Sequence, residues 1–291
     1  MGALDGKVAL VTGAGGGLGR CHALLLAQEG ASVVVNDLGG ARDGTGGSAS
    51  MADQVVAEIK EAGGNAVADY GSVTDPAHAK AMVATAVKEF GKIDIVINNA
   101  GILRDKSFKN MTDDMWDAVV EVHLRGTYLV TKAAWDQMVK QGEGGRFVNT
   151  SSTSGLIGNF GQANYGAAKA GIAGMTRVLA LEGRKYGITV NTLAPAAFSR
   201  MTEDIMPDGV EERLAPEKVS PPVVWLCTDD AKNVTGRQFA VGGNRISLLS
   251  WQVDVIAQKD GAEPAYSVAE VGAAMEASMP SWPKHLKPMD V

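Results

Sequence analysis

The sequence contains little cysteine, and its two cysteines show no pairing pattern. Cys21 and Cys227 are far apart in the 291-residue chain, and neither lies in a CxxC motif or beside a histidine cluster. Such a pattern predicts neither a disulfide framework nor a zinc site. We therefore expect two buried, reduced thiols and no metal.

Long apolar runs and clusters of basic residues are also missing. No apolar stretch approaches the ~18 residues of a membrane span, and the chain opens directly into a strand pattern without a cleavable leader. Asp and Glu total 33 against 27 Lys and Arg, a formal net charge of −6. This balance gives no electrostatic footprint for nucleic acid. We expect a cytoplasmic protein that binds neither nucleic acid nor membrane.

Glycine is abundant, with 36 residues, and short apolar runs alternate with longer segments of helical period. The strand-like runs, rich in β-branched residues, cover 7–13, 31–37, 66–70, 93–99, 145–152, 188–195 and 237–243. The helical segments cover 20–30, 50–64, 77–91, 113–142 and 164–187. Strands and helices that alternate in this way form parallel sheets through right-handed crossovers. We predict an α/β fold: a Rossmann-like, doubly wound parallel sheet of about seven strands with helices on both faces.

The sequence pattern of strands alternating with helices stops near the end of the chain. Residues 1–250 read as one dinucleotide-binding domain, whereas 251–291 combine a short helical segment with a proline-rich stretch that cannot be regular. Ser267 and Glu270 form a capping-box pattern at the start of that helix. Residues 251–291 are too few for a separate domain. We expect this C-terminal extension to pack on the domain or on a partner subunit.

The first predicted strand leads into the sequence TGAGGGLGR, residues 12–20. Glycines there let the backbone turn tightly and approach a ligand, and the helix behind them presents free N–H groups to a pyrophosphate. Asp37 ends the second strand, where a carboxylate accepts hydrogen bonds from the adenosine ribose and repels a 2′-phosphate. These positions predict NAD rather than NADP. The expected contacts of this turn are Gly13, Gly16, Gly17, Leu18 and Gly19.

Three residues further along are candidates for the chemistry. Tyr165 and Lys169 are four apart on a predicted helix and so share a face, and Ser152 ends the fifth strand. Oxidation of an alcohol needs a base for the hydroxyl proton, and a free tyrosine, with a pKa near ~10, is a poor one. We expect Lys169 to lower the pKa of Tyr165, and Ser152 to hold the substrate oxygen.

The spacing TGxxxGxG, the sequence NNAG at 98–101 and the pair Tyr165 and Lys169 together resemble the short-chain dehydrogenase/reductase family, across nearly all of 5–245. The resemblance implies further residues near NAD beyond Tyr165 and Lys169. They are Ser72, Val73, Asn99, Ala100, Gly101, Pro195, Ser199, Met201 and Thr202. It also places His123 where the family usually has an asparagine that supports a proton relay. His123 is therefore a candidate catalytic residue, with a packed helical histidine as the alternative.

Several stretches, among them VHLRGTYLVTKAAW and GNFGQANYGAAK, are similar to one subgroup: the dehydrogenase region of peroxisomal multifunctional enzyme type 2 and its single-domain bacterial relatives. This resemblance implies NAD-dependent oxidation of (3R)-3-hydroxyacyl-CoA to 3-oxoacyl-CoA, with an enoyl-CoA hydratase on a separate chain. Arg104, Lys106 and Lys109 offer a basic rim for CoA phosphates.

Two other functions stay open. One is a 17β-hydroxysteroid or sterol side-chain CoA thioester dehydrogenase, because the same subgroup handles bulky rings. The other is a non-catalytic NAD-binding structural or sensor protein, against which the complete set of Ser152, Tyr165 and Lys169 argues. Family members pair through the helices at 113–142 and 164–187, so we also predict a homodimer or homotetramer.

Overall fold

The structure is a computed structural model that describes residues 2–41, 43–46, 48–198, 209–283 and 286. In these ranges eight strands form one sheet, in the order β3-β2-β1-β4-β5-β6-β7-β8. The first seven run parallel, and β8 pairs antiparallel with β7. The strands are β1 Val8–Thr12, β2 Ser32–Asn36, β3 Asn65–Asp69, β4 Ile95–Asn98, β5 Gly145–Thr150, β6 Ile188–Pro195, β7 Gln238–Gly242 and β8 Arg245–Leu249. The predicted doubly wound α/β fold is confirmed.

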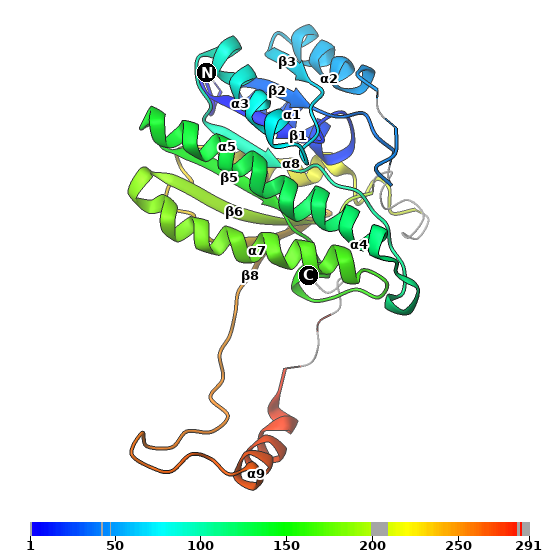
Figure 1. Cartoon of the computed structure of the whole chain (residues 1–291). Coiled ribbons are helices and arrows are strands. Elements are labelled where there is room, and N and C mark those ends of the chain that lie inside the picture. The colour runs from blue at the N-terminus through cyan, green and yellow to red at the C-terminus, as the bar shows by residue number, and fades with distance from the viewer. Residues whose placement is uncertain (1, 42, 47, 199–208, 284–285, 287–291) are drawn as a thin grey trace.

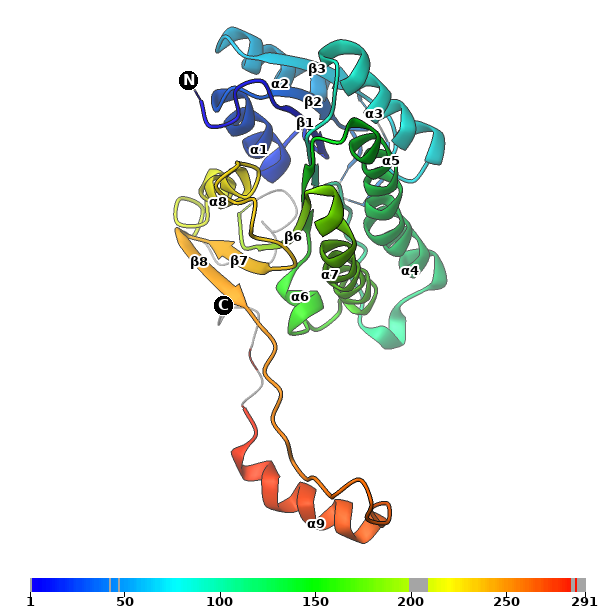
Figure 2. The same ribbon diagram turned by 90° about the vertical axis from the view of Figure 1, so that its left-hand side faces the viewer.

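Helices cover both faces of the sheet (Figures 1 and 2). On one side lie α1, α2 and α8, and on the other α3, α4, α5 and α7. The α-helices are α1 Gly17–Gln28, α2 Ser50–Glu61, α3 Pro76–Phe90, α4 Asp113–Val120, α5 Gly126–Gln141, α6 Thr153–Leu156, α7 Ala163–Gly183, α8 Ser220–Trp225 and α9 Val268–Ser278. The 3₁₀ turns are η1 Phe108–Asn110, η3 Arg184–Tyr186, η4 Pro216–Val219 and η5 Met279–Ser281, and η2 Glu121–Arg125 is a π-helical turn.

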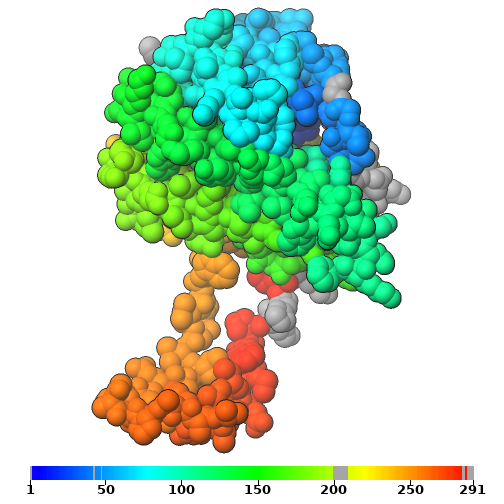
Figure 3. All heavy atoms as spheres, in the orientation of Figure 1, coloured from blue at the N-terminus to red at the C-terminus, as the bar shows by residue number. Residues whose placement is uncertain are grey.

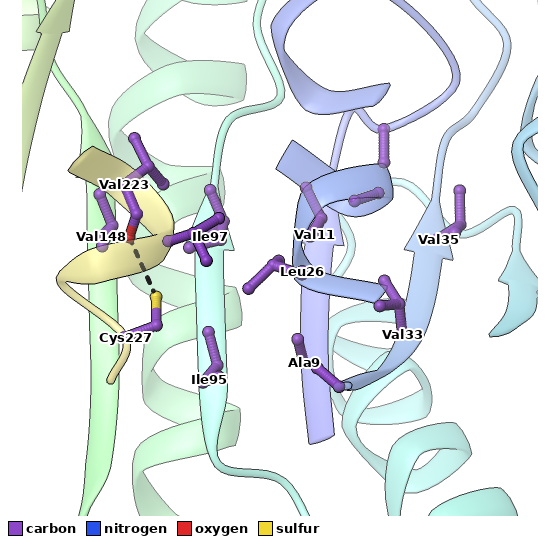
Figure 4. Close-up of a cluster of buried hydrophobic side chains, with 14 of the residues drawn as sticks. Ala9, Val11, Leu26, Val33, Val35, Ile95, Ile97, Val148, Val223 and Cys227 are labelled. Atoms are coloured by element: carbon purple, nitrogen blue, oxygen red, sulfur yellow. Dashed lines mark hydrogen bonds between the residues drawn. The ribbon is translucent and has the colours of Figure 1, made fainter. Parts of the chain in front are cut away.

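Alternate residues of each central strand enter opposite cores. In β1, Ala9 and Val11 pack toward α1 (Figure 4), whereas Val8 and Leu10 join the core under α3 and α5. All four are buried. A strand covered on both faces needs apolar residues at every position, which explains the continuous apolar runs of the sequence.

The strand order places a ligand site at one edge of the sheet. Strand β1 lies between β2 and β4, so the chain leaves β1 toward one side of the sheet and later returns on the other. In open α/β sheets such a switch point leaves a crevice beyond the carboxyl ends of the strands. The glycine turn after β1 and the NNAG loop after β4 both lie at this edge.

The sequence prediction missed one strand. It ended the last strand at residue 243, but Gly243 and Asn244 form a two-residue turn, with φ of 56° and 63°, that returns the chain as β8. Positive φ at both central residues is typical of a type I′ hairpin. The Gly-Asn pair and the alternating residues after it were therefore a readable hairpin signal.

The predicted helix 113–142 is one helical run with a local defect. It consists of α4, the π-helical turn η2 and α5. His123 lies inside the π turn and is buried. π turns in helices often occur at functional sites, because the extra residue displaces a side chain from the regular helical position.

The two cysteines are free thiols, as predicted. Cys227 is buried just after α8 and donates a weak hydrogen bond to the carbonyl of Val223 at 3.3 Å (Figure 4). Burial raises the pKa of this thiol to about 12. Cys21 is only partly buried, contrary to the expectation.

The C-terminal extension begins after β8 and stands away from the domain (Figures 1 and 3). Its helix α9 has the predicted capping box, in which Glu270 N donates to the Ser267 side chain and Ser267 N donates to the Glu270 carboxylate. Arg177 lies over the Trp251 ring at 5.6 Å, near the root of the extension. None of the helices that the structure describes is long and apolar enough to cross a bilayer.

Candidate active site

The glycine turn after β1 is packed too closely for side chains. Gly13 has a φ of +63°, and a Cβ there would lie 2.8 Å from the Cα of Ala100. A Cβ on Gly19 would lie 2.1 Å from the carbonyl oxygen of Gly13. Helix α1 begins behind this turn with Gly16 as its N-cap, and none of the side chains that the structure describes caps it. The first N–H groups of α1 are thus left for an anionic ligand.

The glycine turn and the NNAG loop are joined through Thr12. Its Oγ1 accepts hydrogen bonds from the backbone N–H groups of Asn99 and Ala100, both at 3.1 Å. The Asn99 side chain donates in return to the carbonyls of Thr12 and Gly13, both at 3.0 Å. Sequence reasoning missed Thr12, although the threonine of TGxxxGxG was the available signal. Asn99 and Ala100, which the family resemblance predicts to lie near NAD, are thus held against the glycine turn.

Asp37 lies beside the glycine turn. Its Oδ2 accepts from Gly15 N and its Oδ1 from Gly39 N, both at 2.7 Å. Each carboxylate oxygen has a second lone pair, so ribose hydroxyls can still be bound. A Cβ on Gly15 would lie only 2.8 Å from Asp37 Oδ2. These glycines therefore leave a cradle of backbone donors with one carboxylate at its end, and this arrangement fits a dinucleotide.

The remaining predicted cofactor neighbours are engaged within the protein, lie near the glycine turn only by strand position, or fall outside the described residues. The Ser72 hydroxyl is engaged with Thr74 Oγ1 at 2.8 Å, and Val73 is buried against Gly126 in the core. Pro195 ends β6 at the same edge of the sheet as the glycine turn. Ser199, Met201 and Thr202 lie outside the described residues.

The three candidate catalytic residues come together beside this edge. Ser152 follows β5 and caps α6, since its Oγ accepts from Ser154 N at 3.1 Å. Tyr165 lies in the first turn of α7, and the Nζ of Lys169 is 5.4 Å from the centroid of its ring. Lys169 is buried and donates to the carbonyl of Thr150 at 2.6 Å.

Burial dominates the protonation of this group. It raises the pKa of Tyr165 to about 12, while a side-chain hydrogen bond with Ser152 lowers this pKa and the charge of Asp105 raises it. Burial also lowers the pKa of Lys169 to about 7. Burial therefore shifts the pKa of Tyr165 in the direction opposite to the one expected from Lys169. A buried ammonium loses its own proton more readily and acts as a weaker cation.

His123 joins the same cluster from the π turn. Its Nε2 lies 2.8 Å from the carbonyl oxygen and 3.1 Å from the nitrogen of Ile102. Nδ1 is buried and has no hydrogen-bond partner among the described residues. Burial and then the charge of Lys169 lower the pKa of His123 well below its ordinary value, and a hydrogen bond with Ile102 raises it. Gly101 makes room for the ring, because a Cβ there would lie 2.3 Å from His123 Cε1.

A doubly wound sheet with a glycine cradle and a Ser-Tyr-Lys group at one edge defines a nicotinamide-dependent oxidoreductase. The family model of the short chain dehydrogenases matches residues 7–208. The chain therefore belongs to the short-chain dehydrogenase family.

The chain is similar to several proteins of this family. Over 248 residues, 85% of the chain, it is 54% identical to peroxisomal multifunctional enzyme type 2 of Mus musculus, but spans only 33% of that enzyme's length. It is also 54% identical to a putative short-chain type dehydrogenase/reductase of Mycobacterium tuberculosis, covering 86% of this chain and 87% of that one. A hydroxyacyl-CoA dehydrogenase of the same organism is 45% identical, over 85% of this chain and 80% of that protein.

Solved structures agree with the fold. A short chain dehydrogenase from Mycobacterium avium is 43% identical, with a TM-score of 0.84 and 98% of both chains covered. A 7α-hydroxysteroid dehydrogenase complexed with NADH is 29% identical, with a TM-score of 0.74 over 82% of this chain and 94% of that one. A Mycobacterium paratuberculosis short chain dehydrogenase bound to NAD is 26% identical, with a TM-score of 0.75 over 84% and 99%. These likenesses support a nicotinamide cofactor.

Proposed function

We propose that the chain is an NAD-dependent dehydrogenase that oxidises the 3-hydroxyl of (3R)-3-hydroxyacyl-CoA to the 3-oxo thioester. The observation that carries this proposal is the gathering of Ser152, Tyr165 and Lys169 beside the glycine cradle, in a chain whose relatives include a hydroxyacyl-CoA dehydrogenase. Asp37 supports NAD over NADP, because its carboxylate at the end of the cradle repels a 2′-phosphate.

In the proposed mechanism, Ser152 holds the substrate oxygen and Tyr165 removes its proton. The glycine cradle and Asp37 would hold a dinucleotide, whose oxidised nicotinamide would accept the hydride. Its positive charge would favour the tyrosinate, against the burial that raises the pKa of Tyr165 to about 12. Lys169 is held by the Thr150 carbonyl, and with its pKa near 7 it can take up and release protons near neutral pH.

The basic rim predicted for CoA phosphates is partly engaged within the chain. Arg104 Nε donates to the carbonyl of Asp43 at 3.1 Å, and its Nη1 lies 3.9 Å from the Asp114 carboxylate. Lys106 and Lys109 are exposed. We propose these two lysines, rather than Arg104, as the phosphate contacts.

A steroid or sterol side-chain CoA thioester is the second candidate substrate. The likeness to a 7α-hydroxysteroid dehydrogenase complexed with a bile acid derivative favours it. The two candidates share the chemistry at the hydroxyl and differ only in what surrounds it. A common assay can therefore separate them.

The test is to follow NADH absorbance after mixing the protein with NAD and each of a panel of (3R)-hydroxyacyl-CoA esters, their (3S) isomers and hydroxysteroid thioesters. We expect turnover of the (3R) esters with NAD, little with NADP and none of the (3S) isomers. Preference for the steroid thioesters would select the second candidate.

The matched control is Tyr165→Phe, which keeps the ring but removes the hydroxyl. A positioned general base contributes roughly 10²- to 10⁴-fold, so we expect a rate loss in that range with NADH binding retained. NADH binding without turnover of any substrate by the wild-type protein would instead support the non-catalytic NAD-binding alternative.

We also propose that the protein is a homodimer or homotetramer in which the C-terminal extension packs on a partner subunit. The extension stands clear of its own domain and bears exposed apolar side chains, with Val253 at 88% and Val268 at 91% exposure. Trp251 and Val255 of the same segment are exposed as well, at 70% and 74%, and apolar side chains gathered on one exposed segment favour burial in an interface. Sedimentation measures the mass, and a monomer would contradict the proposal.

We also propose that a separate hydratase supplies the substrate, by adding water to a 2-enoyl-CoA thioester.

A further inference from the structure

Three successive residues of the loop after β4 are hydrogen-bonded to the start of α7. Asn164 Nδ2 donates to the carbonyl of Arg104 at 3.0 Å. The Gln162 side chain donates to Asp105 Oδ2 at 2.7 Å, and Lys106 N donates to the carbonyl of Gly161 at 2.9 Å. This seam ties the loop to the helix turn that carries Tyr165.

Gln162 is the centre of the seam and is almost fully buried, with 7% exposure. Its Oε1 accepts hydrogen bonds from Ser154 Oγ at 2.6 Å and from Asn159 Nδ2 at 3.1 Å. Its Nε2 must then face Asp105, because an ionised carboxylate can only accept. The charge of Asp105 therefore fixes which way the amide points.

The network continues from Gln162 to Ser152. The Ser154 hydroxyl that donates to Gln162 belongs to the residue whose N–H donates to Ser152 Oγ at 3.1 Å. A chain of hydrogen bonds thus runs from the carboxylate of Asp105, through Gln162 and Ser154, to the Ser152 hydroxyl. The network thus ends on the Asp105 carboxylate at one side and on the Ser152 hydroxyl at the other.

The same carboxylate acts on Tyr165 through space. Among the described residues, the groups that act on or lie against Tyr165 are Lys169 from its own helix, His123 from the π turn, Ser152 after β5 and Asp105 from the loop. His123 is held neutral by burial. Asp105 is therefore the negative charge that this set presents to the phenol.

We propose that Asp105 is a positioning residue for the oxidation: its carboxylate orients Gln162, which joins the loop after β4 to α6 and to the turn that carries Ser152. The proposal rests on the proposed dehydrogenase function. It also assigns a physical role to the stretch GNFGQAN, whose glutamine Gln162 joins Asp105 of the loop after β4 to Ser154 of α6.

Two substitutions separate the charge from the hydrogen bond. Asp105→Asn removes the charge but keeps an oxygen that can accept from Gln162. The acid limb of the profile of kcat/KM against pH should move down by roughly half a pH unit, since Asp105 is exposed and its charge is screened. The plateau value of kcat should fall, but by less than in a variant without the Gln162 amide, because the asparagine oxygen can still accept from Gln162.

Gln162→Met is the complementary variant, of similar volume but without hydrogen bonds. It should lower kcat by about tenfold, as expected for loss of an oriented hydrogen-bonding group, without a downward shift of the acid limb. Asp113→Asn removes an exposed charge from the first turn of α4 and serves as the control for net charge. Thermal melting of each variant shows that the fold is kept.

A second measurement does not need turnover. The ultraviolet absorbance of tyrosinate is titrated in the NAD-bound protein, and the Tyr165→Phe curve is subtracted to isolate Tyr165. Asp105→Asn should titrate at lower pH than wild type. If no substrate is oxidised but this shift is seen, the proposed function fails and the effect of Asp105 stands. If Asp105→Asn moves neither curve, or Gln162→Met leaves kcat unchanged, the proposal is overturned.

Discussion

The imidazole of His123 lies edge-on to the phenol ring of Tyr165, with ring centroids 5.1 Å apart and ring planes at 87°. The edge of an aromatic ring is positive and its face negative, so this arrangement is favourable. His123 is also held in place by a hydrogen bond between its Nε2 and the carbonyl oxygen of Ile102. The π turn therefore supplies one wall of the pocket for the tyrosine side chain.

Replacing His123 tests whether this wall matters for rate as well as for stability. His123→Ala leaves a cavity and removes the partner of the Ile102 carbonyl, which should cost about 2–4 kcal/mol of unfolding free energy. We expect kcat to fall as well, because Tyr165 loses a packed neighbour. Denaturant unfolding and steady-state rates measure the two effects.

His123→Asn is the informative companion, because it restores the residue usual in the family. If His123 supports a proton relay, the asparagine should recover much of the rate that alanine loses. Equal rates for the asparagine and alanine variants, with equal stability, would favour the packed histidine instead.

Gly101 and His123 should behave as a coupled pair. Gly101→Ala would place a Cβ 2.3 Å from His123 Cε1, and overpacking of this kind costs about 1–3 kcal/mol. The double variant with His123→Ala should recover part of that loss, as a double-mutant cycle measures. Gly261→Ala is the matched control, since a Cβ there meets nothing within 4 Å. Additive losses would show that the two residues are independent.

The sequence was most informative where function depends on local spacing. Tyr165 and Lys169 share a helix face because they are four residues apart, and the glycine turn follows β1 directly. Both could be predicted from neighbours in the chain. The doubly wound order also followed from alternating strands and helices.

Features that depend on tertiary packing could not be predicted in this way. The π turn at His123 contains no proline or glycine that would predict it. The His123 ring fits only because Gly101 has no side chain where the ring lies. The hydrogen bond between Gln162 and Asp105 joins residues 57 positions apart in sequence. The pKa of Tyr165 was not predicted correctly, because the spacing of Tyr165 and Lys169 does not show how far either group is removed from water.

Cofactor choice should depend on Asp37. In Asp37→Ser the carboxylate that repels a 2′-phosphate is gone, so the preference for NAD over NADP in kcat/KM should fall by about tenfold or more. The variant also loses acceptors for Gly15 N and Gly39 N, so melting must be checked in parallel. Asp43→Ser, an exposed carboxylate of the same loop, should leave the preference unchanged. An unchanged preference in Asp37→Ser would remove Asp37 from the basis of NAD selection.

The free energy of unfolding should decrease as the pH is lowered, because of His22, a histidine remote from the active site. His22 of α1 is fully buried against α8, where its Nδ1 lies 2.8 Å from Ser220 Oγ, and burial lowers its pKa to about 4. Below pH ~6.5 the unfolded chain takes up a proton that the folded chain does not, so stability is retained above that pH. It declines as the pH falls from 6.5 toward 4, by about 3 kcal/mol for this group.

Substitution of His22 isolates this contribution from those of other groups, including His123, which is also held neutral. His22→Gln can keep a hydrogen bond to Ser220 but does not titrate, so its unfolding free energy should vary less between pH 7 and pH 4 than that of wild type. Urea unfolding at a series of pH values gives both slopes. Parallel curves for wild type and His22→Gln would mean that His22 is protonated in the folded protein or that its charge is accommodated there.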